Sequence, residues 1–390
     1  MKYYFRYFTQ HSKFFNNLLS SQESVYFDAS YLYNYQSSCY NLTSKKKLYY
    51  FIDPESFKFQ YGGNKSFYLN YLRYFEELED LFDRENRINL DFLNQSMNFE
   101  DFYKKIVRFQ RTMLASTHIP LDFYTSIAEG TSDLKTYNPL EQLIFIISPY
   151  FEFYEINDNF YKFNKRFSEI TPRNYVLLRF HKNFLSDHSN IDKIVNDFKG
   201  SAGILLNIIN LNQYEIHDLE KYFGNLIDLI YKFAKNQQNV ILMNNSEFGK
   251  YFKYFGLNDV CSNVMIGQKT IDYEPNRSPK RQANTDLVYI PQIERSVSIT
   301  SSQSLISRNK ALKKDYPDGV IELSLDYRIQ YYYEFIKEKI KKINTLDFKG
   351  IIKEFDRNFK QLDYKLHQKK YKYVLNWKEL LNTKYKEFFK

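Results

Sequence analysis

Residues 174–210, "NYVLLRFHKNFLSDHSNIDKIVNDFKGSAGILLNIIN", determine the fold class, because two apolar runs flank a segment of different periodicity. The runs at 175–180 and 203–209 are apolar almost throughout, which is typical of parallel strands buried on both faces. Between them, residues 190–200 have the spacing of an amphipathic helix that ends at a glycine. The stretch therefore predicts a strand–helix–strand unit of a parallel sheet.

Similar apolar runs recur along the chain. With a third strand placed in "STHIPLDFY", the sequence predicts strands near residues 26, 49, 118, 176, 205, 241, 264 and 288. Eight strands over roughly 290 residues match a (β/α)8 TIM-type barrel of the α/β class. A doubly wound open sheet is the alternative, but it usually has a glycine-rich turn after its first strand, and "FDASYLYNY" has none.

The segment between the second and third predicted strands is a long insertion. Residues 66–85 and 98–114 in it have helical spacing of apolar residues. Farther along, "YNPLEQLIFII", residues 137–147, begins with Asn138 and Pro139, the residue types of a helix N-cap and first turn. These residues favour a helix, although "LIFII" alone would suit a strand.

The chain is predicted to divide into a barrel domain at 1–293, a Ser-rich polar linker at 294–318 and a basic helical extension at 319–390. Residues 269–390 contain 26 Lys and Arg against 16 Asp and Glu, a net charge of +10, and the remaining residues have a net charge of −1. This asymmetry indicates an anionic partner, nucleic acid first. A solvated, Lys-rich helical face is the alternative interpretation.

The composition excludes several classes of protein. Aromatic residues make up 19% of the chain, which is inconsistent with disorder. The two cysteines cannot form a Cys-rich zinc site, and no P-loop, HExxH or EF-hand pattern is present, so neither a metal nor a cofactor is expected. The N-terminus has no signal peptide or membrane anchor, so we expect a cytoplasmic protein without membrane contact.

Carboxylates follow several of the predicted strands. In a parallel barrel the active site lies at the carboxyl ends of the strands. Asp28 and Asp53 follow the first two predicted strands and are therefore expected to be neighbours, and Glu247 follows a later one. The three are predicted to be catalytic, as acids, bases or nucleophiles. The alternative for each is a capping or turn role.

Other polar residues at the strand ends are predicted to bind substrate, with Arg179 holding a phosphate. They are His181, Asn207, Asn210, Asn244, Asn245 and Gln268. Nucleic-acid contacts are predicted for the loop "EPNRSPKRQAN" and for the C-terminal helices, through Arg277, Lys280, Arg281, Lys369, Lys370 and Lys372.

The stretch "VYFDASYLYNYQ", with Asp28 and Gln36, resembles the strand-end Asp-Ser-Gly-Gly-Phe-Gln of the tRNA-guanine transglycosylase group. The resemblance implies a barrel and an exchange of bases through a covalent glycosyl link to an aspartate. The glycines of that motif are missing here. The zinc site of the group, Cys-x-Cys-x-x-Cys plus His, cannot be built from two cysteines.

The sequence thus predicts a barrel protein that binds or modifies nucleic acid. One alternative is a non-catalytic interaction subunit of a bacterial defence complex with a protein partner. Another is a barrel hydrolase acting on a small phosphorylated or glycosidic substrate. The reaction type and the oligomeric state are left open.

Overall fold

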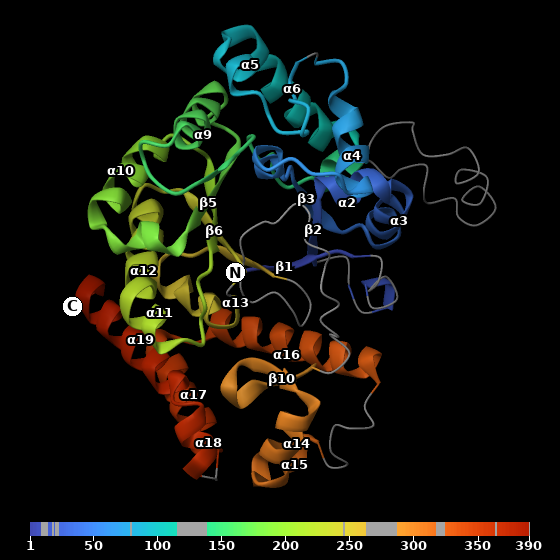
Figure 1. The fold of residues 1–390 in the computed structure, drawn as a ribbon. Helices are drawn as coiled ribbons and strands as arrows, with labels where there is room; N and C mark the ends of the chain where they lie inside the picture. The colour runs from blue at the N-terminus through green and yellow to red at the C-terminus, as the bar shows by residue number, and fades with distance from the viewer. Residues whose placement is uncertain are drawn as a thin grey trace, which may run out of the picture.

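One all-parallel sheet of eight strands forms the centre of the protein, in the order β3-β2-β1-β8-β7-β6-β5-β4 (Figure 1). The computed structural model describes residues 1–8, 15–17, 19, 23–78, 80–114, 139–244, 246–262, 287–316, 324–362 and 365–389. The strands are β1 (Tyr3–Arg6), β2 (Ser24–Asp28), β3 (Tyr49–Asp53), β4 (Glu152–Phe153), β5 (Tyr175–His181), β6 (Gly203–Ile209), β7 (Asn239–Met243) and β8 (Asp259–Ser262). The prediction of an α/β fold with parallel strands is confirmed.

Helices flank the sheet and follow most of its strands. They are α2 (Ala29–Asn34), α3 (Gln36–Lys46), α4 (Ser66–Leu72), α5 (Leu90–Asn94), α6 (Ser96–Thr112), α8 (Pro139–Gln142), α9 (Asn159–Ile170), α10 (His188–Phe198), α11 (Ile216–Asp218), α12 (Gly224–Lys235) and α13 (Ser246–Gly249). Short 3-10 or π turns also occur at η2 (Ser56–Gln60), η5 (Lys182–Ser186), η6 (Leu219–Phe223) and η7 (Lys250–Phe255). The predicted unit of β5, α10 and β6 is confirmed.

The sheet curls around an interior of its own. Alternate residues of a strand point to opposite faces. One set of alternate side chains, from seven of the strands, packs into a single buried cluster: Tyr4, Tyr26, Phe51, Leu177, Leu205, Ile241 and Cys261. The other set, such as Phe27 and Leu178, packs in the core shared with the helices.

The part of the chain that precedes β4 differs from the prediction. A third strand near residue 118 lies outside the described residues. The predicted helix at 137–147 is limited to α8, after which Leu143 forms a bridge with Tyr50 of β3 and Ile147 forms one with Tyr175 of β5. The strand character of "LIFII" prevails here, because this segment hydrogen-bonds strands on both sides: Ile144 donates to Tyr50 O at 2.8 Å, and Tyr175 to Ile146 O at 2.8 Å.

The first and last strands of the predicted barrel also differ from those of the structure. The sequence did not indicate β1, which lies between β2 and β8 in the sheet. The strand near residue 288 exists as β9 (Leu287–Ile290), but it pairs antiparallel with β10 (Arg295–Ser298) in a separate two-stranded sheet. The eight strands are therefore not the eight that were predicted.

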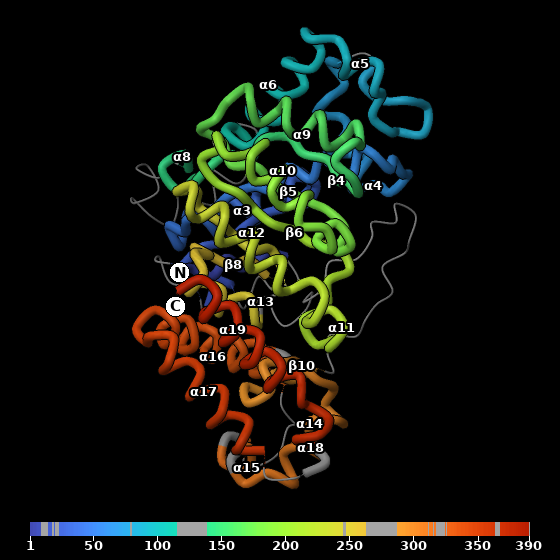
Figure 2. The backbone as a smooth tube through the Cα atoms, turned by 90° about the vertical axis from the view of Figure 1, so that its left-hand side faces the viewer, coloured from blue at the N-terminus to red at the C-terminus, as the bar shows by residue number. Residues whose placement is uncertain are grey.

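The C-terminal part packs closely on the sheet and its helices. Residues 294–318, predicted as a linker, contain β10, α14 (Ile299–Ser307) and α15 (Lys310–Asp315). The helices that follow are α16 (Leu325–Thr345), α17 (Phe348–Lys360), α18 (Lys365–Lys370) and α19 (Tyr373–Phe389). They line one side of the molecule, with α19 beside α12 and α13 (Figures 1 and 2).

The single tryptophan joins α19 to the rest of the protein. The Trp377 side chain is fully buried and stacks on Phe248, with the ring centroids 4.8 Å apart and the planes 2° from parallel. Its indole N–H donates to the carbonyl oxygen of Gln213 at 2.7 Å. Within the described residues, no helix has the length and apolar character needed to cross a membrane.

Candidate active site

A layer of charged side chains lies at the carboxyl edge of the sheet. Two residues beyond an interior apolar residue, the same face carries a polar group in six of the strands, β1 to β6. Arg6 follows Tyr4 in this way, and Asp28 follows Tyr26. We call the set the charged layer: Arg6, Asp28, Asp53, Glu152, Arg179 and Asn207.

Asp28 and Asp53 are brought together as predicted. They are direct register partners on β2 and β3. The Asp28 carboxylate pairs with the guanidinium of Arg6, and although Asp28 occupies the N-cap position of α2, its side chain makes no capping hydrogen bond. Burial raises the pKa of Asp28, while the charge of Arg6 acts in the opposite direction. Helix capping therefore does not explain why an aspartate stands at position 28.

Asp53 has an environment that favours retention of a proton. Its Oδ1 accepts hydrogen bonds from the Tyr150 hydroxyl at 2.7 Å and from the Glu55 backbone N–H at 2.9 Å. Burial, reinforced by the charges of Asp28 and Glu55, raises the pKa of Asp53 to about 7. The bond to the Glu55 N–H fixes the turn after β3, so Asp53 has a structural role there.

Glu55 adds a third carboxylate that the sequence did not indicate. Its backbone has a left-handed conformation, with φ of 49°. Its carboxylate accepts from the Ser30 backbone N–H at 3.0 Å and pairs with Lys58 at 2.5 Å. Burial alone would raise the pKa of Glu55, but Lys58 and Arg6 lower it below its ordinary value. Glu55 is therefore ionised at neutral pH and joins the end of β3 to α2.

Arg179 has a buried carboxylate partner, Glu152, which was also missed. The Arg179 Nε donates to Glu152 Oε2 at 2.8 Å, and its guanidinium lies 4.1 Å from the centre of the Phe57 ring. Glu152 also accepts from the hydroxyls of Tyr61 at 2.7 Å and Tyr154 at 2.9 Å. This ion pair neutralises the Arg179 charge inside the protein.

Several predicted substrate-binding residues shape loops. The His181 ring accepts from the Asn183 backbone N–H at 3.2 Å and so caps η5. Asn210 and Asn244 have positive φ angles of 60° and 62°, a conformation that asparagine tolerates better than most residues. Asn207 is buried in the charged layer beside Arg179, its register partner.

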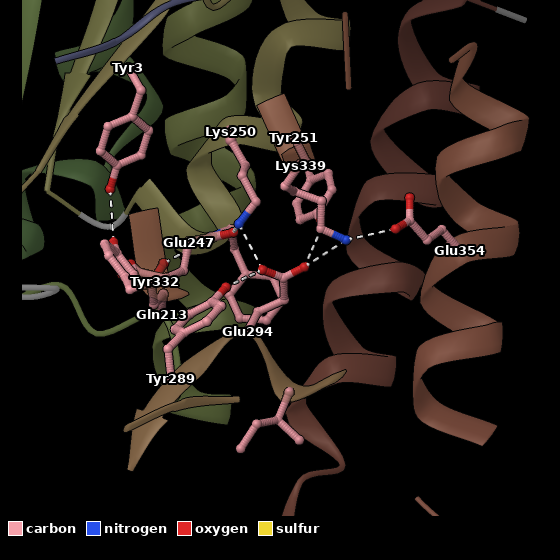
Figure 3. A network of polar contacts seen from close by, with 12 residues as sticks. Tyr3, Gln213, Glu247, Lys250, Tyr251, Tyr289, Glu294, Tyr332, Lys339 and Glu354 are labelled. Atoms are coloured by element: carbon pink, nitrogen blue, oxygen red, sulfur yellow. Dashed lines mark hydrogen bonds and ion pairs between the residues drawn. The ribbon is translucent and has the colours of Figure 1, made fainter. Parts of the chain in front are cut away.

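Glu247 lies away from Asp28 and Asp53, next to a second cluster of polar side chains (Figure 3). Its carboxylate accepts from the Gln213 side chain at 2.6 Å, and its backbone carbonyl accepts from the buried ammonium of Lys250. The sequence grouped Glu247 with Asp28 and Asp53. Its contacts place it instead with the residues that attach the C-terminal helices.

Glu294 is the centre of that cluster. Its carboxylate pairs with Lys250 at 2.8 Å and with Lys339 of α16 at 3.0 Å (Figure 3). The hydroxyls of Tyr251 and Tyr289 each donate to it at 2.6 Å. Burial would raise the pKa of Glu294, but the two lysines lower it to about 2. We call Lys250, Tyr251, Tyr289, Glu294 and Lys339 the Glu294 cluster.

The predicted nucleic-acid contacts are only partly within the described residues. Lys369, Lys370 and Lys372 are exposed, at and just after the end of α18. Asn245, Gln268, Arg277, Lys280 and Arg281 lie outside the described residues. In the part of the chain that is described, no group of three or more His, Cys, Asp and Glu side chains has an arrangement suited to a metal ion.

Comparison with protein-family models, curated proteins and solved structures finds no match for this chain.

Proposed function

We propose that this protein is a TIM-type barrel enzyme that cleaves or exchanges a glycosidic bond in nucleic acid, with the charged layer as its active site. The observation that carries the proposal is the register pair of Asp28 and Asp53 at the carboxyl edge of a parallel sheet, where barrel enzymes have their active sites. The pKa of Asp53, raised to about 7, makes it a proton donor near neutral pH.

The two carboxyl groups have different roles. Neighbouring strands lie about 4.8 Å apart, close to the separation of about 5 to 5.5 Å between the carboxyl groups of retaining glycosidases. Arg6 favours the charged form of Asp28, which attacks the sugar carbon, while Asp53 gives its proton to the departing base. Water then attacks the same sugar carbon and gives a proton to Asp53. The bond between that carbon and Asp28 breaks, so both carboxyl groups return to their starting forms.

Nucleic acid is favoured as the substrate by charge. The C-terminal third carries the net positive charge of the chain, and its lysines at 369, 370 and 372 are exposed. Asp28 and Asp53 are only 5% and 6% exposed, so a base has to leave its stack to reach them. The same burial favours a second candidate function, hydrolysis of a small glycoside.

The test is the release of free base. Single-stranded RNA, single-stranded DNA, duplex DNA and nitrophenyl glycosides are incubated with the protein, and the products are identified by mass spectrometry. The wild type is expected to release base from a nucleic acid, and Asp28→Asn and Asp53→Asn are expected not to.

Asp259→Asn is the matched control. Asp259 is a half-buried carboxyl at the start of β8, at the amino ends of the strands and so at the opposite end from Asp28 and Asp53, where it accepts from the Lys2 backbone N–H at 2.6 Å. This variant is expected to keep its activity. Full activity in both Asp28→Asn and Asp53→Asn would overturn the proposal, and release from the glycosides alone would select the second candidate.

A further inference from the structure

Four aromatic rings form a continuous surface near the charged layer. Tyr31 of α2 is central, because its ring centroid lies 5.4 Å from that of Phe8, 4.8 Å from that of Tyr35 and 6.2 Å from that of Phe67 on α4. Tyr35 and Phe67 also contact each other, at 5.4 Å. We call Phe8, Tyr31, Tyr35 and Phe67 the aromatic platform.

Two of the four rings of the platform are exposed to solvent. Tyr35 is 38% exposed and Phe67 is 39% exposed. Phe8 and Tyr31 are half-buried. Most other aromatic rings of this chain are buried in its core, so the two exposed rings, Tyr35 and Phe67, in contact with each other leave apolar area exposed to solvent.

Hydrogen bonds hold the two helices of the platform in place. The Asn34 side chain donates to the Ser30 carbonyl at 2.7 Å and to the Phe67 carbonyl at 3.2 Å. Asn70 of α4 donates in turn to Asn34 Oδ1 at 2.8 Å. Because α2 and α4 are joined in this way, the rings are ordered before any ligand arrives, which lowers the entropic cost of binding.

Arg6 connects the platform to the carboxylate pair. Its guanidinium pairs with Asp28 and lies 4.7 Å from the centre of the Phe8 ring. Ser30, which precedes Tyr31, donates its backbone N–H to Glu55 at 3.0 Å. A molecule that lies on the platform is therefore next to the proposed reaction centre.

The charges on the segments that carry α2, α3 and α4 favour an anionic ligand. Residues 29–52 and 56–75, which include α2, α3 and α4, contain no Asp or Glu. They contain Lys45, Lys46, Lys47, Lys58, Lys65 and Arg73. Lys65 is exposed two residues from Phe67, whereas Lys58 pairs with Glu55.

We propose that the aromatic platform is a stacking subsite for the bases of a single-stranded nucleic acid, adjacent to the nucleotide that reacts. Exposed rings interleaved with cations are the combination by which proteins bind unpaired strands, through base stacking and phosphate contacts. A duplex does not fit this subsite, because its bases are already stacked on one another. The inference rests on the proposed function for its substrate class and names the form of the strand.

The experiment measures the binding of a fluorescein-labelled single-stranded 12-mer, as DNA and as RNA, by anisotropy. Phe67→Ala and Tyr35→Ala are each expected to raise the Kd by about 5-fold to 150-fold, the loss that follows from removing one base stack. Phe67→Trp is expected to restore binding. Tyr327→Ala is the matched control, because Tyr327 is 50% exposed on α16, and it is expected to bind like the wild type.

A 12-mer of abasic sites separates stacking from general loss of binding. The abasic 12-mer should bind weakly to the wild type, and Phe67→Ala should not lower its affinity further. Unchanged binding of the normal 12-mer by both alanine variants would overturn the subsite. So would a loss of affinity for the abasic 12-mer as large as the loss for the normal one. Anisotropy reports binding and not the release of base, so inactivity of the protein on every substrate would overturn the proposed function and leave this result standing.

Discussion

Asp28 and Asp53 occupy the last register pair of β2 and β3, so two carboxyl groups leave neighbouring parallel strands at the same edge of the sheet. Arg6 pairs with the first, and the Tyr150 hydroxyl donates to the second. The two groups therefore differ in environment although they are adjacent in space. A difference of this kind allows one carboxyl group to act as an acid while the other stays charged.

The ionisation of Asp53 should make the protein less stable as the pH rises. Its pKa is about 7 in the folded state against an ordinary value of 3.8. Between these values the folded protein holds a proton that the unfolded chain has lost, so the free energy of unfolding falls with increasing pH. Asp53→Asn cannot ionise, and its stability relative to the wild type should increase from pH 4 to pH 8, by on the order of 4 kcal/mol.

Urea unfolding of both proteins across this pH range gives the comparison. Equal pH slopes for the wild type and Asp53→Asn would mean that Asp53 ionises normally in the folded state.

Glu294→Gln should be strongly destabilising. The substitution leaves the buried ammonium groups of Lys250 and Lys339 without their shared carboxylate. Loss of one member of a buried ion pair costs about 3 to 5 kcal/mol. Because the pKa of Glu294 is lowered to about 2 from 4.5, the wild type has this stabilisation in full above pH 4.5 and loses it as the pH falls towards 2.

The matched control is Asp192→Asn, which removes a pair with Lys232 at 2.5 Å on the surface, where Asp192 is 61% exposed. It should cost less than about 1 kcal/mol. Chemical denaturation measures both, and similar losses in the two variants would show that the Glu294 cluster does not stabilise the fold.

Trp377 should report the docking of α19. Trp377→Ala removes a fully buried indole and its hydrogen bond to Gln213, and should cost about 3 to 5 kcal/mol. In the wild type the fluorescence of this single tryptophan should shift to longer wavelength in the same transition that unfolds the sheet. A separate, earlier transition would show that the C-terminal helices are an independent unit.

The exposed lysines at the end of α18 should contribute to nucleic-acid affinity through charge. Changing Lys369, Lys370 and Lys372 together to Ala should weaken binding of a single-stranded oligonucleotide and reduce the salt dependence of log Kd, by about 0.7 for each lost phosphate contact. The triple Arg variant keeps the charge and should bind like the wild type. An unchanged salt slope in the Ala variant would place the phosphate contacts elsewhere.

Part of the fold and of the site could be predicted from local patterns. The strands β5, β6 and β7 are long apolar runs, and the residues that follow such runs include Asp28, Asp53, Arg179 and Asn207. Periodicity and the rule for parallel sheets were sufficient to place these side chains at one edge.

The positions of the other residues could not be predicted, because tertiary contacts and not local sequence patterns determine them. β1 has four residues at the start of the chain, too few to show a period, so Arg6 was missed. Glu152 lies in a strand of two residues, and Tyr150 precedes it in a segment without regular structure. Glu247 follows β7 as predicted, but Gln213 and the C-terminal helices determine its surroundings, and these are distant in sequence.

The most direct test of the central claim, that Asp53 carries the catalytic proton, is a titration of its side-chain carboxyl by 13C NMR. The signal is assigned through its absence in Asp53→Asn. The account predicts a midpoint near pH 7 in the wild type and a lower midpoint in Asp28→Asn, because the neighbouring charge of Asp28 helps to raise the pKa. A midpoint near the ordinary value of 3.8, unchanged by Asp28→Asn, would contradict it.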